Sequence, residues 1–82
     1  MTSLDQIGVG EWVRIVRIPG DDAIVHRLLE MGLTDGEEVQ LIARAPLGDP
    51  LEILVRDFRL SLRRSEAARV EVLPAADSDL SQ

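Results

Sequence analysis

Three polar side chains of metal-binding type follow one another at four-residue intervals: Asp22, His26 and Glu30. In a helix this spacing forms one stripe, and carboxylate oxygens with an imidazole nitrogen are suitable ligands for a divalent ion. The 1.5 Å rise per residue, however, separates the outer two by about 12 Å, too far for a single ion. Polar residues at this spacing are also what an amphipathic helix exposes to water. The sequence therefore predicts no metal site and no cofactor. Asp22, His26 and Glu30 are kept as the candidate ligands of a weak site.

The rest of the chain offers little for catalysis. The 82 residues include no cysteine and one histidine, and no Ser, His and Asp set occurs in a nucleophile turn. No glycine-rich phosphate-binding motif is present. The formal net charge of -6 argues against nucleic-acid binding, which needs a surplus of cations. The sequence predicts neither an enzyme nor a nucleic-acid-binding protein.

A short helix is predicted around the polar stripe. At 100° per residue the apolar side chains fall within an arc of about 160°; they are Ile24, Val25, Leu28, Leu29 and Met31. Asp21 or Asp22 can cap the first free amides, and Gly32 follows the last turn. We expect Ile24, Leu28 and Met31 to face the core and Val25 and Leu29 to lie nearer the solvent.

Strand patterns surround this helix. Residues 11–18 form a first strand whose imperfect alternation indicates either two covered faces or a bulge. Clean alternation predicts half-buried strands at 37–44, 51–56 and 58–63, and "RVEVL" at 69–73 supplies a fifth. Asp57-Phe58 is predicted as a tight turn in which Asp57 tolerates positive φ. Residues 64–68 have room for one helical turn.

The elements together predict an all-β fold. About five short strands with one short helix between the first and second favour a small antiparallel β-barrel, because closure removes exposed edges. Residues 1–73 form one domain, and the polar stretch 74–82 is expected to be a disordered tail. No run approaches the ~20 apolar residues of a membrane helix, and no signal peptide is recognisable, so we expect a soluble cytoplasmic protein without direct membrane insertion.

A stiff loop precedes the strand at 51–56. In "APLGDP" the two prolines restrict the backbone, Gly48 allows a sharp bend and Asp49 can bond the local backbone, which would hold Leu47 outward. The loop suits either recognition or a plain connection between strands. The candidate partner-binding surface consists of Val25 and Leu29 together with Leu47, Gly48 and Asp49. Arginines at 56, 59, 63 and 64 indicate a solvated strand face or a site for an anionic partner.

The order of residues between His26 and Val72 resembles the core domain of the ferrous iron transport protein A (FeoA) family. The most specific segments are "RLLEMGLT" at 27–34, "APLGDP" at 45–50 and "RLSLR" at 59–63. The resemblance implies an SH3-like β-barrel that acts as a small accessory of the ferrous iron transporter FeoB, a membrane protein with a cytosolic GTP-binding domain. Asp35 and Asp57-Phe58 depart from the usual family pattern, and both lie in turns.

The expected function follows from this resemblance. The implied partner is the cytosolic domain of a FeoB-like transporter, and a homo-oligomer is the other association that the apolar surface suggests. The alternative is an iron-sensing or regulatory SH3-like module, because a related domain occurs at the carboxyl end of some iron-dependent repressors.

Overall fold

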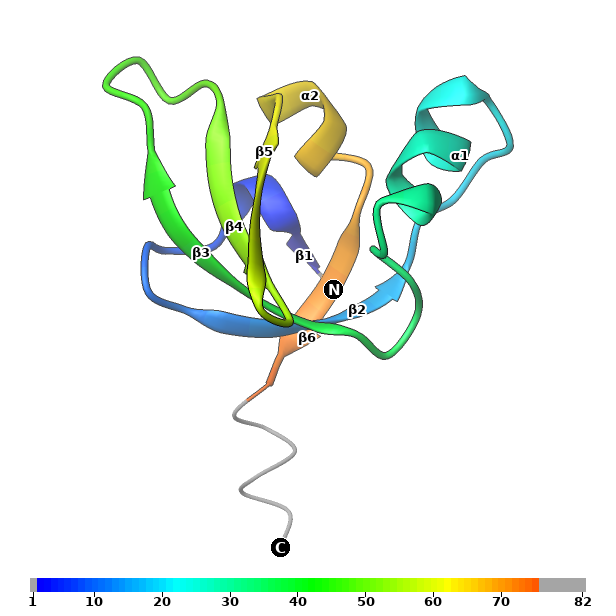
Figure 1. Ribbon diagram of the computed structural model, residues 1–82, viewed down its shortest axis with the longest axis horizontal. Coiled ribbons are helices and arrows are strands. Elements are labelled where there is room, and N and C mark those ends of the chain that lie inside the picture. The colour runs from blue at the N-terminus through cyan, green and yellow to red at the C-terminus, as the bar shows by residue number, and fades with distance from the viewer. Residues whose placement is uncertain (1, 76–82) are drawn as a thin grey trace, which may run out of the picture.

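The computed structural model describes residues 2–75, and its six strands form one antiparallel sheet with the order β1-β6-β2-β3-β4-β5. The sheet curls around the core, with α1 beside it and α2 across one end (Figure 1). The elements in chain order are β1 (Thr2–Ser3), the 3-10 helix η1 (Leu4–Gln6), β2 (Trp12–Arg17), α1 (Ala23–Glu30), β3 (Glu38–Arg44), β4 (Leu51–Val55), β5 (Phe58–Leu62), α2 (Arg64–Ala67) and β6 (Glu71–Pro74). Among residues 2–75, no helix has the length and apolar content needed to cross a bilayer.

The antiparallel all-β prediction is confirmed, but three of its details were wrong. There are six strands instead of five, and α1 lies between β2 and β3 because the short β1 precedes them. The sheet is not a closed barrel, since β1 and β5 stand at its two ends. β1 has only two residues, too few for a visible alternation in the sequence, and the chain turns into η1 directly after it.

The buried side chains follow the alternation that the sequence predicts. Val39 and Leu41 of β3 are fully buried, as are all three inward residues of β4, namely Leu51, Ile53 and Val55. These side chains meet Leu28 and Val72 in one apolar cluster. Because the chain has no cysteine and hence no disulfide, this packing is the main source of stability.

Two bulges curve the sheet. The pairing of β2 with β6 shifts between Ile15 and Arg17, and the pairing of β3 with β4 shifts between Leu41 and Ala43. An extra residue on one strand increases local twist and bends the strand. Of the two explanations offered for the imperfect alternation of the first long strand, the structure therefore shows the bulge.

The β4–β5 hairpin differs from expectation at its turn. Val55 pairs with Phe58, so the turn consists of Arg56 and Asp57. The residue with positive φ is Arg56, at 55°, not Asp57 as predicted. The Arg56 guanidinium binds the Glu37 carboxylate through two hydrogen bonds of 3.2 and 3.0 Å, which fix the turn against the start of β3.

Both ends of the described chain are tied to the sheet. Arg44 donates hydrogen bonds to the carbonyls of Asp5 and Ile7, and the amide of Leu4 donates to Val70. At the other end Pro74 lies in β6 and Ala75 is buried, so these two residues belong to the domain and not to the expected tail. The remainder of that tail, 76–82, lies outside the described residues.

Candidate partner-binding site

The loop between β3 and β4 holds Leu47 away from the protein. The amide of Gly48 donates to the Ala45 carbonyl at 2.7 Å, and the amide of Ala45 donates to the Pro50 carbonyl at 3.0 Å. Gly48 has a φ of 87°, which the close turn requires and other residues rarely adopt. Leu47 at the tip is 93% exposed. The expected outward position of Leu47 is therefore confirmed, and two hydrogen bonds limit the movement of its loop.

Asp49 joins this loop to α2. Its Oδ1 accepts a hydrogen bond of 2.9 Å from the backbone amide of Arg64, the first residue of the helix. The expected bond to the local backbone is thus replaced by one to a residue 15 positions away in the chain. Because this amide has no partner inside the helix, the carboxylate satisfies it and stabilises the helix start.

A buried carboxylate in turn joins α2 to α1. Glu66 is 3% exposed, and its Oε1 accepts from the Arg63 amide at 2.9 Å. Its Oε2 accepts from Nη1 of Arg27 on α1 at 2.5 Å. Sequence reasoning missed the burial of this residue, because the charged segment "RRSEA" has the composition of a solvent-exposed helical turn. The position three residues after the helix cap was the signal that could have identified it.

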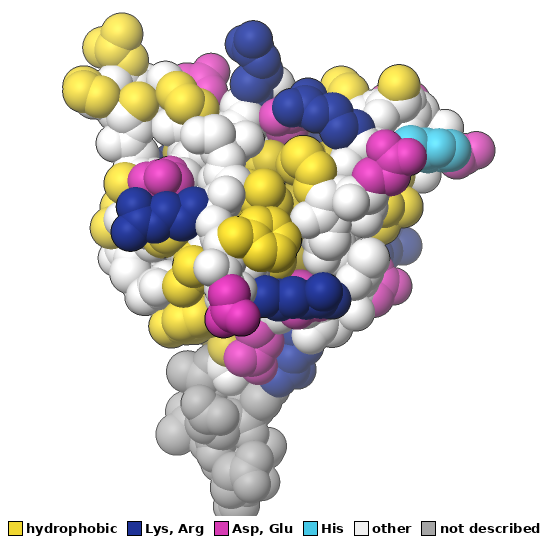
Figure 2. All heavy atoms as spheres, in the orientation of Figure 1, with side chains coloured by type: hydrophobic (Ala, Val, Ile, Leu, Met, Phe, Trp, Pro, Cys, Tyr) yellow, Lys and Arg dark blue, Asp and Glu magenta, His cyan; other side chains and the backbone are white. Residues whose placement is uncertain are grey.

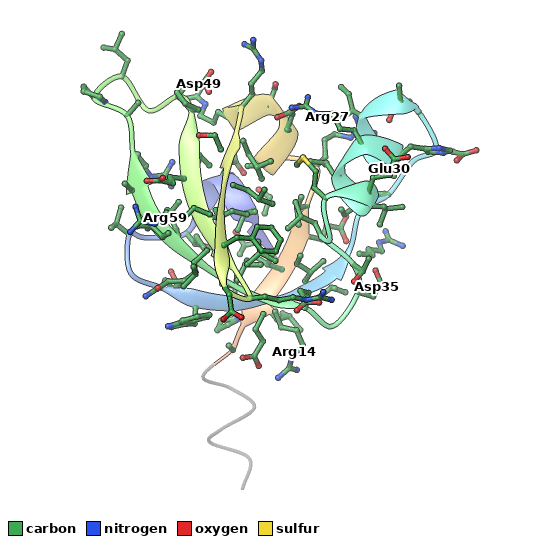
Figure 3. All side chains as sticks on the ribbon, viewed as in Figure 1. Arg14, Arg27, Glu30, Asp35, Asp49 and Arg59 are labelled. Carbon is green, nitrogen blue, oxygen red and sulfur yellow. The ribbon has the colours of Figure 1, made fainter. Side chains whose placement is uncertain are left out.

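We call the resulting surface the rim and define it by Arg27, Leu47, Asp49, Arg63 and Arg64. An open hollow of about 520 Å³ lies beside Leu47, Asp49 and Arg64. A second hollow, of about 360 Å³, lies between Asp49, Arg63 and Arg27. Figure 3 labels Asp49 and Arg27 on either side of α2, and Figure 2 shows basic side chains along the same edge. The rim thus combines an apolar tip with cations in a protein whose net charge is -6.

The apolar side chains of α1 are oriented differently from the prediction. Val25 is only 3% exposed and packs in the core with Leu28, so its expected position near the solvent was wrong. Ile24, expected to face the core, is 39% exposed. Leu29 is 41% exposed, as expected. Exposed apolar surface on α1 is therefore supplied by Ile24 and Leu29.

Leu29 does not join Leu47 in one patch. Arg27 reaches α2, and Leu29 lies about 200° further around the helix, which directs it away from α2. The 45–50 loop and α1 also lie at opposite ends of the molecule with α2 between them (Figure 1). The structure brings together Leu47, Gly48 and Asp49 of the predicted surface, and leaves Val25 and Leu29 outside it.

The polar stripe of α1 is occupied by other contacts. Asp22 caps the helix by accepting from the Val25 amide at 3.1 Å, and the Arg69 guanidinium also donates to it. Nε2 of His26 lies 2.6 Å from Oδ1 of Asp21, a residue outside the predicted set. Within residues 2–75 no three His, Cys, Asp or Glu residues form a metal-binding group. Asp22, His26 and Glu30 are not brought together as ligands.

These contacts shift two pKa values. The hydrogen bond from Arg69, followed by that from the Val25 amide, lowers the pKa of the Asp22 carboxyl below its ordinary value. The hydrogen bond with Asp21 raises the pKa of His26 above its ordinary value of 6.5, and the charges of Glu30 and Asp22 add to the effect. In both cases neighbours on the protein surface favour the charged form of the group.

Several known proteins similar to this chain are named for iron(II) transport. The fusion protein of Fe(2+) transport protein A and Fe(2+) transporter FeoB from Porphyromonas gingivalis is 38% identical over 69 residues. The match covers 84% of this chain and 8% of the fusion protein, so the chain corresponds to a small part of that relative.

Solved structures show the same fold. Iron(II) transport protein A from Clostridium thermocellum is 31% identical with a TM-score of 0.87, covering 92% of this chain and 46% of that one. FeoA from Stenotrophomonas maltophilia, an SH3 domain protein solved in complex with zinc, is 35% identical with a TM-score of 0.79. The match covers 89% of this chain and 91% of that one. IdeR from T. acidophilum shares the fold alone at 22% identity and a TM-score of 0.78, over 89% of this chain and 33% of that one.

The family model agrees with these similarities and spans almost the whole described domain. It is the FeoA domain model, and it matches residues 2–74, from β1 to the last residue of β6. The similarity to an SH3 domain protein also agrees with the curled antiparallel sheet. The chain belongs to the FeoA domain family.

Proposed function

We propose that the chain is a small cytosolic accessory protein of Fe(II) uptake that binds the cytosolic part of a FeoB-like transporter. The observation that carries the proposal is the relative in which a similar segment and the transporter form one polypeptide. Two segments that are covalently joined in one protein have a high effective concentration for each other, and separate chains must replace this by a binding surface. The proposed role is association, with no catalytic step and no direct contact with nucleic acid.

The rim is the surface that we assign to this association. Leu47 is almost fully exposed, yet its loop is fixed by the turn hydrogen bonds and by Asp49, so little conformational entropy is lost when it is buried. Leu47 and Arg64 line the same open hollow, and protein interfaces combine an apolar centre with arginines. Within residues 2–75 the Arg63 and Arg64 guanidinium groups form no ion pair, so they remain available to carboxylates of the partner.

Calorimetric titration of the chain with the purified cytosolic part of a FeoB-like transporter tests this assignment. We expect Leu47→Ser to weaken binding about tenfold or more, and Arg64→Glu to weaken it and reduce its salt dependence. Val9→Ser is the matched control, because Val9 is an exposed apolar residue on the segment before β2. Unchanged affinity in Leu47→Ser, with binding still present in the native chain, would place the interface elsewhere. No binding at all would refute the function.

A further inference from the structure

β5 presents a free edge of the sheet. Within residues 2–75 it pairs only with β4, beginning with Val55 and Phe58 on either side of the turn. In an antiparallel ladder the direction of the backbone groups alternates, so Phe58, Leu60 and Leu62 bond β4. The N–H and C=O groups of Arg59 and Ser61 therefore point away from the sheet, and no other backbone group of the described chain bonds them.

The side chains of this edge are separated into an apolar and a polar face. Phe58 is 45% exposed and Leu60 is partly buried against the core, while Arg59 and Ser61 are exposed on the other face. Figure 2 shows hydrophobic side chains at the surface between β5 and α1. An exposed strand with four unpaired backbone groups and an apolar face is a template for pairing with another strand.

We propose that the occupant of this edge is β5 of a second copy, paired antiparallel about a two-fold axis at Leu60. Arg59 of each copy then faces Ser61 of the other, and the two pairs form four backbone hydrogen bonds. On the apolar face Leu60 meets Leu60, and Phe58 lies opposite Leu62 of the second copy. Because Leu62 is fully buried in its own chain, Phe58 and Leu60 supply the apolar contact. The interface is isologous, so it closes as a dimer and does not propagate into a fibre.

Charge selects this register over its neighbours. With the axis at Leu60, Asp57 lies opposite Arg63 of the second copy, and this ion pair occurs twice. A register moved by two residues in either direction loses both Asp57–Arg63 pairs. It also places Arg59, which Glu52 neutralises only in part at 3.8 Å, opposite Arg59 or opposite Arg63, and like charges facing each other on paired strands are destabilising. The remaining like-charge approach, Arg56 to Arg64, lies beyond the hydrogen-bonded pairs, and Glu37 already binds Arg56.

The dimer is expected to be weak. A strand of five residues covers far less than the roughly 1,200 Å² per complex at which stable interfaces begin. We expect a dissociation constant between about 10 μM and 1 mM, and a monomer at lower concentrations. We therefore expect self-association only where the protein is locally concentrated.

A charge exchange tests the register. Sedimentation equilibrium of Asp57→Arg and of Arg63→Asp should each show dimerisation weakened about tenfold, since each places like charges opposite each other twice. The double variant with both substitutions restores the opposite-charge pairs and should recover association to within about threefold of the native chain. A double variant as weak as the single ones would overturn the proposal.

A cysteine placed on the axis provides a second test, and the native chain has no cysteine to interfere. Leu60→Cys brings two thiols opposite each other at a strand pair, close to the separation that a disulfide needs. Under mild oxidation we expect a covalent dimer, formed at least about tenfold faster than by the matched control Ser61→Cys, whose residue faces Arg59. Equal rates for the two variants would contradict the two-fold axis.

Two further outcomes would refute the dimer. The first is a native chain that remains monomeric by sedimentation at about 1 mM. The second is a hydrogen-exchange result. In it the Arg59 and Ser61 amides become protected when the transporter's cytosolic part is added, but not when the chain alone is concentrated. The first outcome does not bear on the rim, because the rim is tested with Leu47 and Arg64; the second would add the β5 edge to the surface that binds the transporter.

Discussion

Glu66 carries a carboxylate into the interior of the protein, where each of its two oxygens has a different partner. One accepts from the Arg63 amide and so completes the start of α2, while the other accepts from Arg27 of α1. A charge is tolerated in an interior only when it is paired and hydrogen-bonded. This single side chain therefore determines how the two helices are connected across the rim.

Replacing Glu66 should reduce stability according to how many of its hydrogen bonds the new side chain can still form. We expect Glu66→Ala to lower the free energy of unfolding by about 1–3 kcal/mol, because the Arg63 amide is left without its acceptor. Glu66→Gln keeps that acceptor and should be less destabilised. Urea unfolding measures both, with Glu30→Ala as the exposed control, expected within about 0.5 kcal/mol of the native chain. Equal destabilisation by Ala and Gln would show that the charge alone matters.

The pair of Asp21 and His26 makes the chain sensitive to pH. Because the folded pKa of His26 is raised, its contribution to stability is fully present below pH 6.5 and is lost as the pH rises through the folded pKa. Asp21→Asn should lower this pKa towards 6.5, whereas Glu30→Gln should change it less. The single histidine can be titrated by NMR without ambiguity of assignment. A titration midpoint unaffected by Asp21→Asn would contradict the pairing.

At the scale of elements, α1 shows how a helix acquires its rotation about its own axis. Five apolar residues span an arc of about 160° in the sequence, so hydrophobicity alone does not decide which of them face the core. The polar ends decide it, because Asp22 is held by Arg69 and Arg27 is held by Glu66. These two contacts hold the helix in the rotation that has Val25 inward and Ile24 outward.

Paired substitutions on α1 should therefore have unequal effects. Val25→Ser places a hydroxyl in the core and removes methyl groups, and we expect a decrease of about 2–3 kcal/mol in the free energy of unfolding. Leu29→Ser changes an exposed side chain and should stay within about 0.5 kcal/mol. Thermal or urea unfolding compares the two directly. A decrease of similar size for both would mean that Leu29 is also covered in solution.

The strands were predicted more closely than the helix orientation, for a physical reason. Alternation with a period of two assigns each residue to one of two faces, so Leu51, Ile53 and Val55 could be placed inside from the sequence alone. Contacts between distant segments leave no such pattern. The bond from Asp49 to the Arg64 amide and the burial of Glu66 depend on where the elements meet, which local sequence does not determine.

At the scale of the whole molecule, the sheet has a protected centre and two unequal ends. β2 and β6 have neighbours on both sides, whereas β5 has one. In dilute solution we expect the amides of Arg59 and Ser61 to exchange with solvent at least about a hundredfold faster than that of Leu60, which lies in the same strand but bonds β4. NMR-detected exchange at micromolar concentration measures this contrast. Similar protection of all three would show that the edge is covered within one chain.

The place of β6 between β1 and β2 also has a consequence for synthesis. A nascent chain leaves the ribosome from its N-terminus, so the hairpins of β3, β4 and β5 can form as they emerge. β1 cannot, because its partner is residues 71–72 of the last strand. Until translation has passed these residues, β1 has no partner strand and remains accessible to chaperones and proteases. Of the six strands, the one that is translated first is thus among the last to be paired in the sheet.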